Sequence, residues 1–120
     1  MKVRHYKDVD NLLFKEEGAS KVSIRWLIGE RDNPPNFYLR MIEVEPGGYT
    51  PYHKHSKEHE VFVLEGEGKI RDEKGNEHFL KEGTIVYVPP MEKHQFKNSG
   101  ERVLKFLCIC LLYTSPSPRD

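Results

Sequence analysis

The sequence predicts an all-β protein, an antiparallel sandwich or barrel formed by one domain. Three observations support this prediction. Short apolar runs recur at even spacing, turn residues bracket each run, and helical periodicity is almost absent. A chain of 120 residues can bury one modest core but not two. We therefore expect a single domain.

The first two predicted strands show the alternation that is typical of a sheet with one buried face. In residues 21–28 every even position is apolar, and a break follows at the Asn33-Pro34 step. The second run, residues 37–44, ends before Pro46 and the two glycines that follow it. Between these elements and the N-terminus, residues 10–17 are compatible with a helical turn.

The later predicted strands are separated by turns that contain glycine or proline. Gly75 sits in a Lys-Gly-Asn sequence between two short runs, which predicts a hairpin turn. Gly66 and Gly68 follow one run, and Pro89 follows another. These later strands are predicted at residues 59–64, 69–72, 77–80, 84–88 and 103–112.

Composition and charge exclude several classes of partner. Lys and Arg total 19, as do Asp and Glu, so no global field favours nucleic acid or an anionic membrane. The longest apolar run, residues 103–112, is interrupted by Lys105 and is much shorter than the roughly 20 residues that span a bilayer. The charged first residues lack the apolar centre of a signal peptide. We expect a soluble cytoplasmic protein whose Cys108 and Cys110 are free thiols.

Three of the six histidines fall within seven residues, and they are the first functional signal. Residues of equal parity share one face of an extended strand, so His53, His55 and His59 would project to the same side. Val61 and Val63 continue that register, which places the imidazoles at the end of an apolar interior. Buried neutral imidazoles need partners for their ring nitrogens. One metal ion supplies a partner to each ring at once.

Glu60 is the rival of His59 for the third position in this group. An inward Glu60 would turn Val61 and Val63 outward and move the apolar pattern to the wrong face. Parity therefore favours His59. We interpret the isolated histidines, His5 and His78, as ordinary surface or core residues.

Two spaced motifs carry a resemblance to a known family. The first reads Gly47, five residues, His53-x-His55, three residues, His59, six residues, Gly66. This spacing resembles the first motif of the cupin superfamily, in which glutamate usually occupies the position of His59. Histidine at that position is similar to small single-domain cupins with an all-histidine site, some of which bind manganese.

The second motif also resembles the cupin pattern, with one departure. Gly83, Pro89, His94 and Asn98 stand at the family spacing. Met91 occupies the place where the family often has glycine. Because that position belongs to a turn, the departure concerns loop geometry more than metal binding.

The resemblance implies a double-stranded β-helix, or jelly-roll, cupin barrel over residues 1–112, with its core at about residues 20–110. Residues 113–120 do not resemble the family and are predicted to be a disordered or foreign tail. The resemblance also implies that one divalent transition metal is bound, with manganese preferred and iron, nickel, copper, cobalt or zinc as alternatives. The implied ligands are His53, His55, His59 and His94.

Four neutral imidazoles leave the charge of a divalent ion uncompensated, so an anionic substrate or hydroxide would be attracted to any open position. An octahedral ion would keep two adjacent positions open for substrate and dioxygen. The leading hypothesis is therefore a metal-dependent, dioxygenase-like oxidoreductase that acts on a small organic substrate. The alternatives are a metal-dependent isomerase or decarboxylase, for which the sequence shows no inward carboxylate, and a non-catalytic barrel that binds or senses a small ligand.

Strand parity predicts Arg40, Phe106 and Cys108 as inward residues of the substrate pocket. Arg40 is either a contact for a substrate carboxylate or enolate, or a structural ion pair at the barrel rim. Phe106 and Cys108 are expected mainly in the core, where Cys108 would be open to oxidation if dioxygen were activated nearby.

The resemblance also implies a homodimer. An exposed apolar surface is expected either on the strand face of Trp26 or at the outward Phe62 and Leu64, and a partner copy would cover it.

Overall fold

Strands are the main secondary structure of the described part of the chain. The structure is a computed structural model that describes residues 1–112. Two short 3-10 turns, η1 (Tyr6–Asp8) and η2 (Glu30–Asp32), accompany the strands. The strands are β1 (Asn11–Leu13), β2 (Ser20–Ile28), β3 (Phe37–Tyr49), β4 (His59–Glu65), β5 (Glu67–Arg71), β6 (Glu77–Lys81), β7 (Ile85–Val88), β8 (Gln95–Lys97) and β9 (Leu104–Leu111).

The all-β class predicted from the sequence is confirmed. The predicted tail, residues 113–120, lies outside the described residues. Within residues 1–112, no helix has the length and apolar character that crossing a membrane would require.

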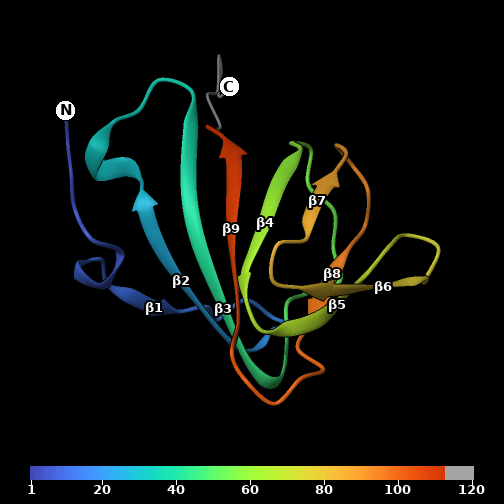
Figure 1. Ribbon diagram of the computed structural model, residues 1–120. Helices are drawn as coiled ribbons and strands as arrows, with labels where there is room; N and C mark the ends of the chain where they lie inside the picture. The colour runs from blue at the N-terminus through green and yellow to red at the C-terminus, as the bar shows by residue number, and fades with distance from the viewer. Residues whose placement is uncertain (113–120) are drawn as a thin grey trace.

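The strands form a curled sheet in which every hydrogen-bonded pair of neighbours is antiparallel. The strand order is β6-β5-β8-β3-β9-β4-β7, and β2 joins β1 to the free side of β3. Figure 1 shows β2, β3, β9 and β4 side by side, with β5 and β6 crossing on the other side of the barrel. Strand β3 belongs to both halves, because Val44 pairs with Leu104 of β9 whereas Tyr49 pairs with Lys97 of β8.

Residues 46–48 form a corner within β3 instead of the strand end that the sequence predicts. The N–H of Gly47 donates to the carbonyl oxygen of Asn98 at 3.2 Å, and the N–H of Asn98 donates to the carbonyl oxygen of Gly48 at 3.0 Å. A Cβ atom on Gly48 would lie 2.6 Å from the carbonyl oxygen of Ser20. Glycine therefore lets β3 bend from one half of the barrel into the other without losing its hydrogen bonds.

The N-terminal segment differs from the sequence-based expectation. Residues 10–17 contain strand β1 in place of a helical turn, with Leu12 paired to Ile24 on the edge of β2. Both Leu12 and Leu13 are exposed, so their burial does not specify the strand. The edge of β2 offers unpaired backbone N–H and C=O groups, and this segment forms hydrogen bonds with them.

Alternation within the strands fills the interior as predicted. In β4, Val61 and Val63 are buried, whereas Phe62 between them is 45% exposed. At the centre, Phe96 and Phe106 stack with ring centroids 4.3 Å apart. The buried cluster consists of Val22, Ile24, Ile42, Val44, Val61, Val63, Ile70, Leu80, Val88, Phe96, Leu104, Phe106 and Cys108.

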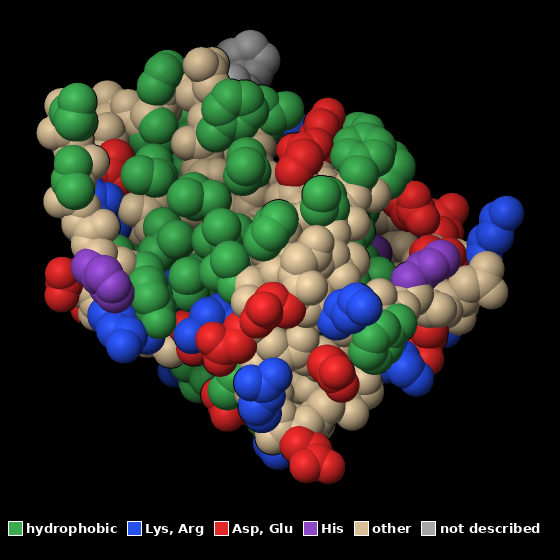
Figure 2. All heavy atoms as spheres, viewed as in Figure 1, with side chains coloured by type: hydrophobic (Ala, Val, Ile, Leu, Met, Phe, Trp, Pro, Cys, Tyr) green, Lys and Arg blue, Asp and Glu red, His purple; other side chains and the backbone are tan. Residues whose placement is uncertain are grey.

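The outside of the larger half of the barrel carries a group of exposed apolar side chains. Register places Phe62 opposite both Leu107 and Ile85, so apolar residues run across neighbouring strands. Figure 2 shows hydrophobic side chains gathered over β3 and β9. We call this surface the outer apolar face and define it by Phe37, Phe62, Ile85, Tyr87, Ile109 and Leu111. Trp26, the other predicted surface residue, instead packs against the core.

The link between β4 and β5 generates a stability prediction. Gly66 has φ +87°, and a Cβ atom there would lie 2.2 Å from the carbonyl oxygen of Val103. Gly75 in the β5–β6 turn has the same φ of +87° but no atom within 4 Å of its Cβ position. We expect Gly66→Ala to cost more than about 3 kcal/mol of unfolding free energy and Gly75→Ala only about 1 kcal/mol. Urea unfolding of both variants measures the difference, and equal costs would contradict the close backbone contact.

Candidate metal centre

The backbone joins His53 to His94, although the two residues lie in distant parts of the chain. The N–H of His53 donates to the carbonyl oxygen of His94 at 3.1 Å, and the N–H of His94 donates back to the carbonyl oxygen of His53 at 2.9 Å. This isolated antiparallel bridge sets the two histidines opposite each other. Their rings lie 5.8 Å apart between centroids. The two motifs found in the sequence therefore meet at one point.

The segment between His53 and His59 is a bent loop, which corrects the prediction of one extended strand. Residues 54–58 have no strand structure, and β4 begins only at His59. The loop is tied to the second motif because the N–H of Met91 donates to the carbonyl oxygen of His55 at 2.6 Å. Met91 has φ +69°, so it adopts the left-handed conformation that glycine would hold with less strain. Its turn thus keeps the geometry typical of glycine.

Three imidazoles form a group able to bind one metal ion. The available ligand atoms of His53, His55 and His94 all lie within 4.8 Å of one another. The Nε2 atoms of His53 and His55 are 3.0 Å apart. On His94 the other ring nitrogen, Nδ1, lies 2.9 Å from the carbonyl oxygen of Glu92, which leaves Nε2 for the cluster. Imidazole nitrogens are the commonest protein ligands for divalent transition metals.

His59 stands beside this group. Its ring centroid lies 4.9 Å from that of His55 and 5.8 Å from that of His94. Its Nδ1 lies 3.4 Å from Sγ of Cys108, whereas its Nε2 is buried and has no hydrogen-bond partner among residues 1–112. A buried ring nitrogen without a partner is costly, and a metal ion would satisfy it. Glu60, the rival ligand, is not among the residues that line the cavity in front of the histidines.

The imidazoles are held in the neutral form that metal binding needs. Burial, followed by repulsion from His53, lowers the pKa of His55 to about 4. Burial, followed by the charge of Arg40, lowers the pKa of His59 to about 3. Burial is also the main cause of the lowered pKa of His94. Near neutral pH these rings therefore carry free lone pairs.

The histidines open onto a cavity of about 120 Å³ inside the barrel. The three pocket residues predicted from the sequence, Arg40, Phe106 and Cys108, all line it. A guanidinium nitrogen of Arg40 donates to Sγ of Cys108 at 3.2 Å, and its Cζ lies 5.7 Å from the centre of the Trp26 ring. The salt bridges formed among residues 1–112 do not include Arg40. Among these residues, the ion pair considered from the sequence is therefore not formed.

Glu16 is a cavity residue that the sequence reasoning missed. It comes from the loop after β1 and lines the cavity, with Oε1 3.4 Å from Nδ1 of His53. Neither strand alternation nor a spaced motif marks this loop, so the sequence contains no signal that would have found it.

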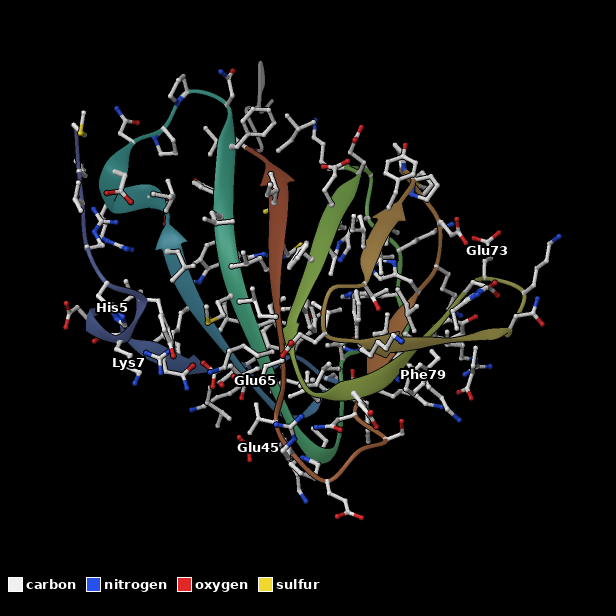
Figure 3. The ribbon with its side chains drawn as sticks, viewed as in Figure 1. His5, Lys7, Glu45, Glu65, Glu73 and Phe79 are labelled. Atoms are coloured by element: carbon white, nitrogen blue, oxygen red, sulfur yellow. The ribbon has the colours of Figure 1, made fainter. Side chains whose placement is uncertain are left out.

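Asn98 of the second motif and the two other histidines, His5 and His78, lie outside the cluster. The side-chain amide of Asn98 donates to the carbonyl oxygens of Val44 and Arg102, both at 2.8 Å, so it fixes a loop. His78 is exposed and pairs with Asp72 at 2.9 Å. Figure 3 shows His5 near Lys7 on the N-terminal segment, at the outside of the molecule.

Comparison with known families agrees with this geometry. A family model described as the cupin domain matches residues 40–110. The chain belongs to the cupin family. The matched range contains all four histidines of the cluster but not Glu16.

Proteins similar to this cupin have several different names. The 1-methylthio-D-xylulose 5-phosphate methylsulfurylase of Rhodospirillum rubrum is 30% identical over 102 residues, which are 84% of this chain and 65% of that protein. This cupin thus spans slightly less than two thirds of the methylsulfurylase. The oxalate-binding protein of Thermotoga maritima is 30% identical over 98 residues, 79% of each chain.

A solved structure supports the same family. The polyketide cyclase RemF from Streptomyces resistomycificus superimposes with a TM-score of 0.87 at 33% identity, covering 92% of this chain and 79% of that one. The single-domain jelly-roll barrel expected from the motifs is confirmed by this likeness and by the curled sheet. The group of three histidines agrees with a metal site in a cupin.

The lowered pKa values generate a prediction for the metal-free protein. An unfolded chain takes up protons on histidine as the pH falls below about 6.5, whereas folded His55 and His59 stay neutral until about pH 4 and about pH 3. The unfolded state then binds more protons, so the free energy of unfolding falls as the pH falls from 7 to 5. We expect His59→Gln to reduce this fall and His5→Gln, at an exposed site, to leave it unchanged. Thermal melts at pH 7 and pH 5 measure this loss of stability. A loss in His59→Gln equal to that of the wild type would contradict the lowered pKa of His59.

Proposed function

We propose that this cupin is a metal-dependent enzyme acting on a small organic anion, with His53, His55, His59 and His94 as the ligands. The observation that carries the proposal is the combination, in one cavity, of imidazoles with an arginine that forms no salt bridge with any of residues 1–112. When bound, the ion supplies a Lewis acid. The protein supplies the orientation of the ligands, an apolar wall that excludes water, and the charge of Arg40.

The charge balance of the cavity favours an anionic substrate. Neutral imidazoles leave the two positive charges of a divalent ion uncompensated, and Arg40 adds a third. Glu16 is the single carboxylate on the cavity wall among residues 1–112, and it is directed to His53. A planar guanidinium suits a carboxylate or an enolate, because both present oxygens that accept parallel hydrogen bonds.

Two reaction classes share this arrangement. The dioxygenase-like oxidoreductase expected from the sequence requires a redox-active ion with two open positions. An electrophilic reaction, such as isomerisation, decarboxylation or cyclisation, requires only the Lewis acid and a group that handles protons. The similarity to a polyketide cyclase at 33% identity favours the second class. We therefore place the electrophilic class first.

The dependence of turnover on dioxygen distinguishes the two reaction classes. We expect turnover of a small oxygenated anion to continue in the absence of dioxygen, because the electrophilic reaction consumes none. Parallel assays of the metal-loaded protein under air and in an anaerobic chamber test this point. Turnover that is lost anaerobically and returns with air would instead support the oxidoreductase class.

Manganese is the ion we propose, on the basis of the resemblance to all-histidine cupins. Imidazole ligands also suit iron, nickel, copper, cobalt and zinc, and manganese binds more weakly than these ions in the usual affinity order. Elemental analysis of protein purified without chelators identifies the ion. We expect about one equivalent in the wild type and far less in His94→Ala, because this substitution removes one ligand from the centre.

The contribution of Arg40 can be measured with oxalate as a probe, since a similar protein is named an oxalate-binding protein. We expect Arg40→Gln to weaken oxalate binding to the metal-loaded protein by roughly 10-fold to 100-fold, because a charge-assisted hydrogen bond is lost. Arg102→Gln, at an exposed position, is the matched control and should bind as the wild type does. Isothermal titration calorimetry provides the affinities. Unchanged affinity of Arg40→Gln for oxalate would show that Arg40 does not contact the anion.

We also propose that a second copy of the chain covers the outer apolar face, giving the homodimer expected from the resemblance. Apolar side chains exposed across adjacent strands favour association over exposure to water. Ile85 is 75% exposed and Tyr87 58% exposed on this face, values typical of side chains that lack a partner.

Light scattering after size exclusion tests the dimer. We expect the wild type to be dimeric and Phe62→Lys to be monomeric, because the substitution places a charge within the outer apolar face. Val3→Lys, at a position that is 88% exposed and outside this face, should stay dimeric. A monomeric wild type at tens of micromolar would contradict the proposal.

A further inference from the structure

We propose that Glu16 is a positioning residue of the metal centre, which holds the ring of His53 so that its Nε2 faces the ion. This inference rests on the proposed metal site. The two ring nitrogens of His53 have different partners: Nδ1 lies 3.4 Å from Oε1 of Glu16, and Nε2 lies 3.0 Å from Nε2 of His55. The carboxylate and the cluster thus lie on opposite sides of the same ring.

Two of the other rings, those of His94 and His59, show the same division of roles. Nδ1 of His94 lies 2.9 Å from the carbonyl oxygen of Glu92, and Nδ1 of His59 lies 3.4 Å from Sγ of Cys108. In all three rings Nδ1 points to the protein and Nε2 is left for the centre. The partners differ in strength, because a thiol and a carbonyl are neutral whereas a carboxylate is charged. Among these three partners, Glu16 therefore supplies the one negative charge.

A carboxylate at this position affects the ligand in two ways. It fixes the proton on Nδ1, so the lone pair is on Nε2 and the ring does not rotate out of position. It also raises the basicity of the imidazole and returns some negative charge to a centre whose ligands are otherwise neutral. His53 benefits from this support because its side chain is 27% exposed and is less confined by packing than buried His59 and His94.

The loop that carries Glu16 is anchored to the barrel. The N–H of Phe14 donates to the carbonyl oxygen of Val22 at 2.9 Å, and Phe14 also lines the cavity. The N–H of Ala19 donates to the carbonyl oxygen of Glu16 itself at 3.1 Å, which closes a turn. Residues 14–19 therefore form a strap across the wall of the cavity, and this strap lies outside the region that the cupin domain model matches.

Substitution of Glu16 should leave the fold intact. Its side chain is 48% exposed, and an ion pair with that exposure contributes little to folding. A loss of metal affinity in a Glu16 variant would then report on the ligand and not on unfolding. Adjacent Glu17 is exposed and carries the same charge, so Glu17→Gln controls for the long-range effect of one lost negative charge.

The experiment is a titration of metal-stripped, full-length protein with Co²⁺. Calorimetry measures the affinity, and the visible spectrum of the bound ion reports on its ligands. We expect Glu16→Ala to weaken Co²⁺ binding about 10-fold to 100-fold. Glu16→Gln should lose less, because its amide oxygen can still lie beside Nδ1, although it carries no negative charge. Glu17→Gln should bind as the wild type does, and the melting temperature of metal-free Glu16→Ala should equal that of the wild type. The Co²⁺ spectrum should shift in Glu16→Ala, since one ligand is no longer held.

Three results would overturn the inference. The first is affinity in Glu16→Ala within twofold of the wild type, and the second is an equal loss in Glu17→Gln, which would indicate only bulk charge. The third is an unfolded Glu16→Ala protein, which would make the residue structural. If the wild type itself binds no Co²⁺, the proposed metal site fails instead, so the two failures are distinguishable.

Discussion

The pair of backbone hydrogen bonds between His53 and His94 is the contact on which the site depends. Each residue donates to the other, at 3.1 Å and 2.9 Å, so the bridge fixes the distance between two segments that are far apart in sequence. The loop that carries His55 is attached to the same place through Met91, whose N–H donates to the carbonyl oxygen of His55 at 2.6 Å. The corner in β3 and the short strand β8, which pairs with β3, bring these segments together. Side-chain geometry at the centre thus follows from backbone pairing, which anchors the histidines to the rigid part of the barrel.

Burial then determines the chemistry of the rings that this pairing assembles. The interior lowers the pKa values of His55, His59 and His94, so these imidazoles stay neutral and make good metal ligands but poor proton donors. Within residues 1–112, the same interior leaves Nε2 of His59 without a partner. A metal ion that binds the rings would relieve this cost, so ion binding and folding of the barrel would be coupled. Arg40 enters the same cavity and makes it positive, which orients the proposed function towards anions.

Much of the fold and of the site could be predicted from the sequence, because both depend on local patterns. Alternation in β4 placed Val61 and Val63 inside, and the spacing of two motifs selected the histidines that the structure brings together. Strand parity selected these histidines for a reason that was wrong, since residues 54–58 bend and it is the loop that turns the ring of His55 towards the other histidines. Glu16 was missed because its loop has no periodic pattern and is placed by tertiary contacts. The corner in β3 was read as a strand end, since proline and glycine mark both features equally well.

X-ray absorption at the zinc edge of protein fully loaded with Zn²⁺, as a probe in place of Mn²⁺, tests the central claim most directly, because it counts the nitrogen and sulfur atoms bound to the ion. Our account predicts a shell of nitrogen or oxygen at roughly 2.0–2.1 Å, with the outer-shell scattering of four imidazole rings. A sulfur at roughly 2.3 Å would instead assign Cys108 as a ligand. That result, or scattering from fewer than three imidazoles, would contradict the convergence of the histidines on one ion.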